Sequence, residues 1–237
     1  MASEFISYVD DGLECEAYVA RPARLDAAPA VLVCHAWGGQ DDFARRSADR
    51  LAGLGYVGFA LDVYGKGRRG TTKEECSALM TPLAQDRALL RRRLLGAVRE
   101  ARSLTGVDPS RIAAIGYCFG GLCALDLARA NASGLRAVVS FHGLLSAPEI
   151  GPQLPIGAEV LVLHGYDDPM CTPEQVVAFA REMDAAKARW EIDMYGGTMH
   201  AFTNPQANDP GFGTVYSPRA DARSWSAMGD FLARSLA

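Results

Sequence analysis

The stretch AAIGYCFGGLCALDLA, residues 113–128, passes from an apolar strand into an apolar helix through one short turn. The turn has the pattern G-x-C-x-G, with Cys118 at its centre and Gly116 and Gly120 two positions away on either side. A nucleophile on such a turn takes a strained backbone conformation, and small neighbours let the strand and the helix approach each other. The free N–H groups at the start of the helix favour an anion such as a thiolate. The pattern therefore predicts that Cys118 is a nucleophile.

Outward from this turn, short apolar runs alternate with helical stretches. Strands are predicted at residues 30–35, 56–62, 111–117, 136–142, 159–165 and 190–195, and a long helix over residues 81–104 with Pro82 in its first turn. Two alternating runs around Asp11-Gly12 predict an antiparallel hairpin at the sheet edge. The alternation indicates an α/β fold with a mostly parallel sheet covered by helices on both faces, and a single domain over residues 1–237.

Composition narrows the range of functions. The chain has 237 residues, 49% of them hydrophobic, and a formal net charge of -4, which argues against a general nucleic-acid binder. Its six cysteines lack paired spacing, so neither a disulfide framework nor a zinc site is expected, and the four histidines show no metal-ligand spacing. The N-terminus lacks a signal-peptide pattern, and no apolar run is long enough to span a membrane. We expect a cytoplasmic protein that works without a metal.

A cysteine nucleophile needs a base, and the base needs a group that fixes its tautomer. His200 follows the last predicted strand on a Gly-rich loop, and the stretch HGYDDP after the strand at 159–165 supplies Asp167 and Asp168. In an open α/β sheet, ligands bind beyond the carboxyl ends of the strands, where these residues fall. The order nucleophile, acid, histidine is that of an α/β-hydrolase.

Four stretches together carry a resemblance to a known family: G-Y-C-F-G-G, H-G-Y-D-D-P, M-H-A-F and GYVGFALDVYGKG. With them the chain resembles, nearly end to end, the dienelactone hydrolase family, a cysteine branch of the α/β-hydrolase fold. The resemblance implies hydrolysis of carboxylic esters or lactones by a Cys-His-Asp triad, through an acyl-thioester and without a cofactor. By position it implies Cys118 as nucleophile, His200 as base and Asp168 as acid, with Asp167 as the rival.

The same resemblance implies an oxyanion hole made by the backbone N–H groups of Phe119 and Trp37. A structural role is expected for His35, which shapes the loop after the first internal strand. His142 and His164 are expected to be strand-end residues that are structural or line the pocket.

Two positions depart from the enzyme that opens dienelactones. As aligned by resemblance, Ala36 stands where that enzyme has a glutamate, and Asn204 where it has an arginine that holds the substrate carboxylate. Lys66, Arg68 and Arg69 could supply positive charge instead, although a solvated basic loop is the simpler interpretation. The substrate is therefore expected to be a small ester or lactone, and neutral esters are expected to suit the pocket better than a carboxylate-bearing lactone.

Three other interpretations remain open. A thioesterase or small peptidase could use the same triad, because a fold does not fix its substrate. A redox protein could pair Cys118 with Cys123, although five residues of helix turn Cys123 to another face. The third is a noncatalytic binding protein on a hydrolase scaffold. For the oligomeric state, both a monomer and a homodimer are compatible with the sequence.

Overall fold

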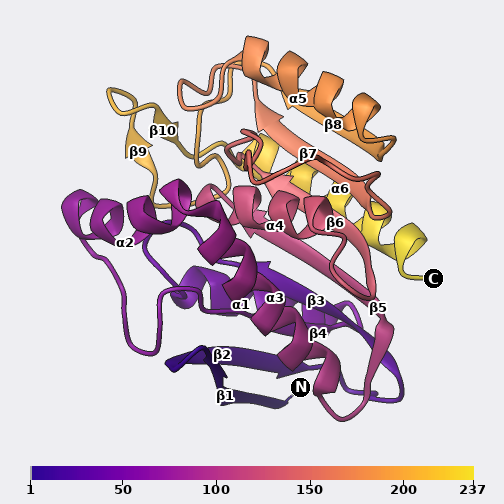
Figure 1. Ribbon diagram of the computed structural model, residues 1–237. Coiled ribbons are helices and arrows are strands. Elements are labelled where there is room, and N and C mark those ends of the chain that lie inside the picture. Colours follow the sequence, from indigo (N-terminus) through magenta and orange to yellow (C-terminus); the bar gives the residue numbers. More distant parts are fainter. Residues whose placement is uncertain (1) are drawn as a thin grey trace.

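Eight strands form one sheet in the computed structural model, which describes residues 2–237 (Figure 1). The strand order is β1-β2-β4-β3-β5-β6-β7-β8, and every pair from β4 to β8 is parallel. The strands are β1 (Ala2–Asp10), β2 (Leu13–Arg21), β3 (Ala28–Cys34), β4 (Val57–Ala60), β5 (Val107–Tyr117), β6 (Leu135–Phe141), β7 (Glu159–Gly165) and β8 (Arg189–Tyr195). The α/β class and the mostly parallel sheet are confirmed.

The antiparallel part of the sheet lies at its N-terminal edge. β1 pairs with β2 from Ala2 opposite Arg21 to Asp10 opposite Leu13, and β2 continues antiparallel onto β4. The two turn residues both have positive φ, +47° at Asp11 and +80° at Gly12. That combination is typical of a type I′ turn, whose twist matches the strands it joins, so the predicted hairpin is present.

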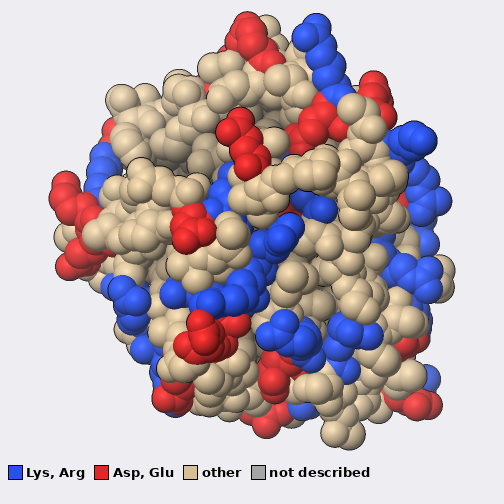
Figure 2. All heavy atoms as spheres, in the orientation of Figure 1, with Lys and Arg blue, Asp and Glu red and all other residues tan. Residues whose placement is uncertain are grey.

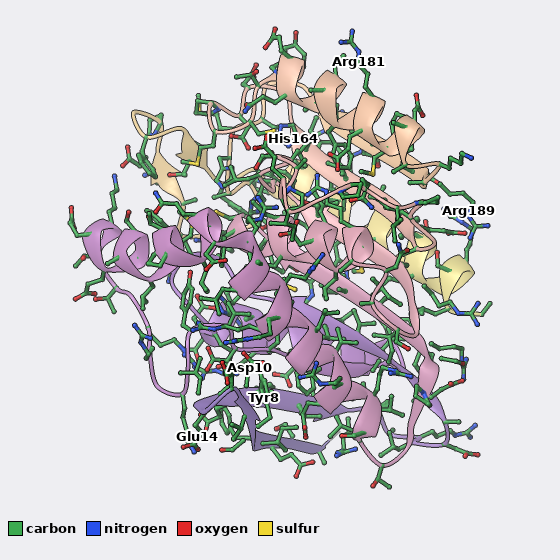
Figure 3. All side chains as sticks on the ribbon, in the orientation of Figure 1. Tyr8, Asp10, Glu14, His164, Arg181 and Arg189 are labelled. Carbon is green, nitrogen blue, oxygen red and sulfur yellow. The ribbon has the colours of Figure 1, made fainter. Side chains whose placement is uncertain are left out.

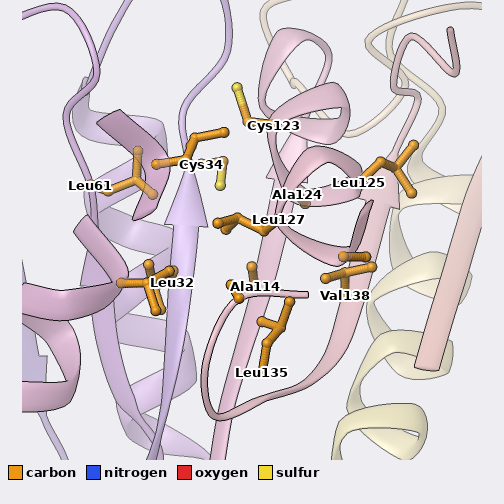
Figure 4. Packing of buried hydrophobic residues seen from close by; sticks show 14 of the residues in the cluster. Leu32, Cys34, Leu61, Ala114, Cys123, Ala124, Leu125, Leu127, Leu135 and Val138 are labelled. Atoms are coloured by element: carbon orange, nitrogen blue, oxygen red, sulfur yellow. The ribbon is translucent and has the colours of Figure 1, made fainter. Parts of the chain in front are cut away.

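Helices cover both faces of the sheet. On one face lie α1 (Asp42–Gly53) and α6 (Pro218–Ser235), and on the other lie α2 (Lys73–Gln85), α3 (Arg87–Ser103), α4 (Phe119–Arg129) and α5 (Pro173–Ala185). Side chains alternate along β3, so Val31 and Val33 pack toward α1 while Leu32 and Cys34 face the opposite layer. Figure 4 shows this second layer, with Leu32 and Cys34 packed near Leu127 of α4.

The prediction of one long helix over residues 81–104 is wrong in the first turn of that helix. Pro82 lies inside α2, near the C-terminal end of that helix, and α3 starts five residues later at Arg87. Asp86 separates the two because its backbone is not helical and its side chain accepts a hydrogen bond from the N–H of Leu89, 2.9 Å away. An aspartate that caps a helix in this way competes with continuation of the preceding helix.

A buried ionic cluster ties three helices to the loop between β6 and β7. Arg87 of α3 makes two hydrogen bonds with Asp126 of α4, at 2.7 and 2.6 Å, and Arg129 makes two with Glu182 of α5, both at 2.8 Å. Arg129 also donates to the carbonyl of Leu145, 2.8 Å away. Because removing one partner of a buried ion pair leaves an uncompensated charge, this cluster holds the loop in one position.

Charges of both signs are mixed on the face shown in Figure 2, where lysine and arginine side chains lie next to aspartate and glutamate. Arg92, for example, pairs with both Asp10 and Asp11. Within residues 2–237, no helix combines the length and the apolar character needed to cross a membrane.

Gly120 provides a test of the close packing between α4 and β3. A Cβ atom there would lie 2.0 Å from the carbonyl oxygen of Cys34, so Gly120→Ala should lower the free energy of unfolding by roughly 1–3 kcal/mol or more. In Gly229→Ala, the matched control in α6, the new methyl group meets no atom within 4 Å and should raise stability by roughly 0.5–1 kcal/mol. Urea denaturation measures both, and equal stability of Gly120→Ala and the unsubstituted protein would contradict the packing argument.

Candidate active site

The three residues predicted to carry the chemistry lie on loops that leave the same edge of the sheet. Cys118 comes directly after β5, Asp168 lies three residues after β7, and His200 lies five residues after β8. Because β5, β7 and β8 run parallel within one sheet, their carboxyl ends meet at that edge.

Cys118 has the strained backbone expected of a nucleophile on a strand-to-helix turn. Its φ is +56° and its ψ is −117°, a conformation that non-glycine residues rarely adopt. Close contacts explain the flanking glycines, since a Cβ on Gly116 would lie 1.9 Å from the carbonyl oxygen of Gly120 and one on Gly121 would lie 2.7 Å from Cα of Gly143. Cys118 is half-buried and sits at the N-cap of α4 with no capping side chain, so the helix N-terminus stays open toward the site.

His200 and Asp168 form a buried pair. Nδ1 of His200 lies 2.7 Å from Oδ2 of Asp168, and the two side chains are 2% and 0% exposed. The other carboxylate oxygen of Asp168 accepts a hydrogen bond from the N–H of Met170 at 2.8 Å, which fixes the carboxylate in place. Nε2 of His200 is buried with no protein hydrogen-bond partner among residues 2–237, so this nitrogen is free to exchange a proton.

Electrostatics favour a protonated imidazole at His200. Burial lowers the pKa of His200, but the negative charges of a Cys118 thiolate and of the Asp168 carboxylate outweigh it and raise that pKa to about 10. An imidazolium beside a thiolate is an arrangement that activates a cysteine for nucleophilic attack.

Asp167, the rival acid, points elsewhere. Its side chain is exposed, and its N–H donates to the carbonyl of Thr198 at 3.0 Å. Of these two carboxylates, the structure brings only that of Asp168 to His200.

The N–H groups predicted for the oxyanion hole are both without acceptors. No hydrogen bond from Trp37 N–H or Phe119 N–H to another group occurs among residues 2–237. Phe119 is the first residue of α4, where helix N–H groups have no intrahelical partner. The Tyr64 hydroxyl donates to the carbonyl of Trp37 at 2.9 Å, which fixes the peptide group between Trp37 and Gly38, next to the one that carries the Trp37 N–H.

The other three histidines are buried and bonded to nearby groups. His35 lies 2.7 Å from the carbonyl of Ala36, His142 lies 2.8 Å from the Thr203 hydroxyl, and Nε2 of His164 lies 2.9 Å from the carbonyl of Cys171. His164, labelled in Figure 3, is a buried residue of β7 itself. Burial lowers the pKa of all three, most strongly that of His142, so they are neutral side chains that hold loops together.

A cavity of about 360 Å³ opens above Cys118 and His200. Its walls come from α1, from α2 and from the ends of β3, β5, β6, β7 and β8 with the loops after them. Apart from Cys118, His142 and His200 they consist mainly of apolar and small side chains: Ala36, Trp37, Asp41, Phe43, Met80, Tyr117, Leu144, Met170, Ala201, Thr203, Asn204, Phe212 and Thr214. Asp41 is the one carboxylate in this set, and it caps α1 by accepting from the N–H of Ala44 at 3.0 Å. No lysine or arginine is in the set.

A larger hollow of about 570 Å³ lies between β8 and α6, next to Arg219 and Arg223. It contains neither Cys118 nor His200. We place the candidate site in the smaller cavity because Cys118 and His200 line it.

The basic loop considered as a source of positive charge is engaged elsewhere. Lys66 pairs with Glu14 at 2.9 Å, Arg68 donates to the carbonyl of Tyr64, and Arg69 donates to Gln40. None of the three basic residues lines the cavity.

The sequence patterns did not identify most of the residues that form the cavity wall. Met80 and Phe43 come from helices, and Leu144 and Met170 come from loops whose course depends on tertiary packing. Phe212 lies in the Gly-rich segment 211–213, the one local signal that could have drawn notice to it.

Comparison with known proteins agrees with the geometry. Residues 15–236 match the dienelactone hydrolase family. The chain belongs to that family. The match covers most of β2, all strands from β3 to β8 and the three loops that carry Cys118, Asp168 and His200.

Several relatives lie close to this dienelactone hydrolase family member. An uncharacterized protein of Caenorhabditis elegans is 38% identical over 150 residues, covering 62% of this chain and 95% of the relative. A protein of Aquifex aeolicus named "Putative carboxymethylenebutenolidase" is 25% identical, with 96% of each chain covered. The crystal structure of a dienelactone hydrolase-like promiscuous phosphotriesterase from metagenomic libraries is 33% identical with a TM-score of 0.93, covering 100% of this chain and 99% of that one. Family membership makes this α/β-hydrolase-fold protein a carboxylic ester hydrolase.

Replacing Asp168 should change the titration of His200. In Asp168→Asn, burial still lowers the pKa of His200 while one negative charge is lost, so that pKa should fall below about 10. Because the pKa of His200 is higher in the folded protein than in the unfolded chain, protonation of His200 stabilises the fold. This contribution to the free energy of unfolding is fully present below about pH 6.5 and is lost as the pH rises through about 10. NMR titration of the imidazole measures the shift.

Asp167→Asn is the matched control for that experiment. It removes an exposed carboxylate one residue away and should leave the His200 titration unchanged. A fall in the pKa of His200 in Asp167→Asn but not in Asp168→Asn would reverse the assignment of the acid.

Proposed function

We propose that this dienelactone hydrolase family member cleaves carboxylic esters or lactones with a Cys118-His200-Asp168 triad through an acyl-thioester. The observation that carries the proposal is the buried His200-Asp168 pair, 2.7 Å between Nδ1 and Oδ2, beside a cysteine on a strained turn. In this proposal Asp168 fixes the tautomer of His200, His200 transfers the proton and Cys118 attacks the ester carbonyl.

In the first half of the proposed reaction, the proton of the Cys118 thiol already lies on Nε2 of His200, and the thiolate sulfur bonds to the carbonyl carbon of the ester. The carbonyl electrons move to oxygen, and the N–H groups of Trp37 and Phe119 donate to that oxyanion. When the tetrahedral intermediate collapses, the bond to the leaving oxygen breaks and His200 protonates the alcohol. An acyl-thioester on Cys118 remains.

In the second half, water enters from the cavity and His200 removes one of its protons. The hydroxide oxygen bonds to the acyl carbon, the same two N–H groups stabilise the second oxyanion, and the carbon-sulfur bond breaks. The Cys118 thiolate and protonated His200 are restored, and the carboxylic acid is released. Since the triad generates its own nucleophile, the proposed cycle needs no metal or cofactor.

Removing the thiol tests the nucleophile. Cys118→Ala should abolish turnover of p-nitrophenyl acetate, and mass spectrometry of the unsubstituted protein, quenched during turnover, should find the acetyl group on the peptide that contains Cys118. Cys123→Ala, five residues further along the chain in α4 and buried, is the matched control and should keep its activity. Near-normal turnover by Cys118→Ala would refute the proposed mechanism.

The cavity favours a neutral substrate. No lysine or arginine lines it, Lys66, Arg68 and Arg69 are paired elsewhere, and Asn204 stands where the resemblance implies an arginine. A substrate carboxylate would lose its hydration in this apolar cavity without gaining an ionic partner. We therefore propose small neutral esters or lactones as the substrate class.

Introducing an arginine at position 204 tests the proposed preference for neutral substrates. Asn204→Arg should raise the ratio of kcat/KM for a dienelactone to kcat/KM for phenyl acetate by about ten- to a hundredfold, the effect of one charge-assisted hydrogen bond. Asn204→Gln is the uncharged control and should leave the ratio near its original value. A strong preference of the unsubstituted protein for the dienelactone would contradict the proposed substrate class.

The other chemical interpretations have less support. Burial raises the pKa of Cys123 well above its ordinary value, and that side chain is 1% exposed, so it is poorly suited to resolve a disulfide with Cys118. A thioesterase would use the same three residues, and including a thioester in the kinetic comparison separates it from an esterase.

A further inference from the structure

Phe212 separates two hollows on the surface of this protein. The inner one is the cavity of about 360 Å³ above Cys118, and the outer one is an open groove of about 760 Å³ along α2. Trp37 and Phe212 are in the walls of both. Their rings stack with centroids 6.0 Å apart and an interplanar angle of 21°, so together they form a barrier, here called the aromatic barrier.

The outer groove follows one side of α2. Besides the two aromatic residues, its walls are Lys73, Glu74, Ser77, Ala78, Thr81 and Pro82. Met80 of the same helix lines the inner cavity. The helix α2 therefore borders both hollows, and without the aromatic barrier they would join into one longer cleft.

Phe212 is held in place although it is 38% exposed. It lies in the turn between β9 (Asn208–Asp209) and β10 (Thr214–Val215), where its N–H donates to the Asp209 side chain at 3.0 Å. Nζ of Lys73 lies 2.8 Å from Oδ2 of Asp209 and 4.2 Å from the centre of the Phe212 ring. Figure 1 shows β9 and β10 beside the N-terminal end of α2.

The same turn is bonded to the proposed base. The N–H of His200 donates to the carbonyl of Gly213 at 3.0 Å, and the N–H of Val215 donates to the carbonyl of His200 at 3.1 Å. Gly213 has a φ of +81° and packs so closely against Pro169 that a Cβ would lie 2.1 Å from its ring. The aromatic barrier is therefore placed relative to His200 by the backbone.

From these contacts we propose that Phe212 is a specificity-determining residue that limits the length of the ester accepted at Cys118. This inference rests on the proposed esterase function. Its ring closes the inner cavity toward the groove along α2, so short acyl chains fit and longer ones meet the stacked rings of Trp37 and Phe212. Removing the ring opens the groove, whose wall of alanine, proline and threonine groups beside Trp37 accepts the distal part of a longer chain.

The test compares p-nitrophenyl decanoate with p-nitrophenyl acetate. In Phe212→Ala, the ratio of kcat/KM for the decanoate to that for the acetate should rise at least tenfold, and in Phe212→Trp, which enlarges the barrier, it should fall. Phe5→Ala is the matched control, because it removes an exposed phenylalanine from β1 at the far edge of the sheet and should leave the ratio unchanged.

The outcomes separate the two proposals. Acetate turnover that persists in Cys118→Ala refutes the proposed function, whatever the chain-length ratio. If acetate turnover depends on Cys118 but the ratio stays within twofold in both Phe212 variants, the barrier proposal is overturned. An equal loss of activity on both esters overturns it as well, because that result means that Phe212 only supports His200.

Discussion

The close approach of β5, α4 and β3 around Cys118 is the constraint on which the site depends. Backbone atoms of Gly120 and Cys34 lie where Cβ atoms on Gly116 and Gly120 would otherwise be, so the chain can turn from strand to helix within one residue only because both positions are glycine. As a result Cys118 has a positive φ, a strained backbone conformation that the packing of the surrounding sheet maintains. The same turn starts α4 directly after Cys118, so the first N–H of the helix, that of Phe119, has no intrahelical acceptor next to the proposed nucleophile.

Other parts of the fold place the remaining site residues near Cys118. Parallel strands deliver Asp168 and His200 to the same edge, and the backbone of His200 is bonded to the turn that carries Phe212. On the opposite side, the buried arginines of α3 and α4 hold the loop after β6, which contributes Leu144 to the cavity wall. The site is thus assembled from long-range contacts, each of which also contributes to stability.

The cavity combines a polar reaction centre with apolar surroundings. Low polarity strengthens the interaction between the Asp168 carboxylate, the His200 imidazole and a Cys118 thiolate, and this explains how a buried histidine retains a raised pKa. The residues that line this cavity include no lysine or arginine that could pair with a charged substrate. In the proposed function, the residues that would react with the ester are therefore separate from the wall residues that would contact the rest of the substrate.

The sequence by itself determined the α/β class, the strands, the N-terminal hairpin and the position of the turn at Cys118, because these follow from local periodicity and from glycines that only a tight turn requires. It also singled out His200 and two adjacent carboxylates. Only the tertiary structure decided which carboxylate faces His200, since Asp167 and Asp168 differ in burial rather than in local pattern. The boundary between α2 and α3 and the cavity wall of Met80, Leu144 and Phe212 were likewise decided by packing, because contacts between segments far apart in the chain leave no periodic trace in the sequence.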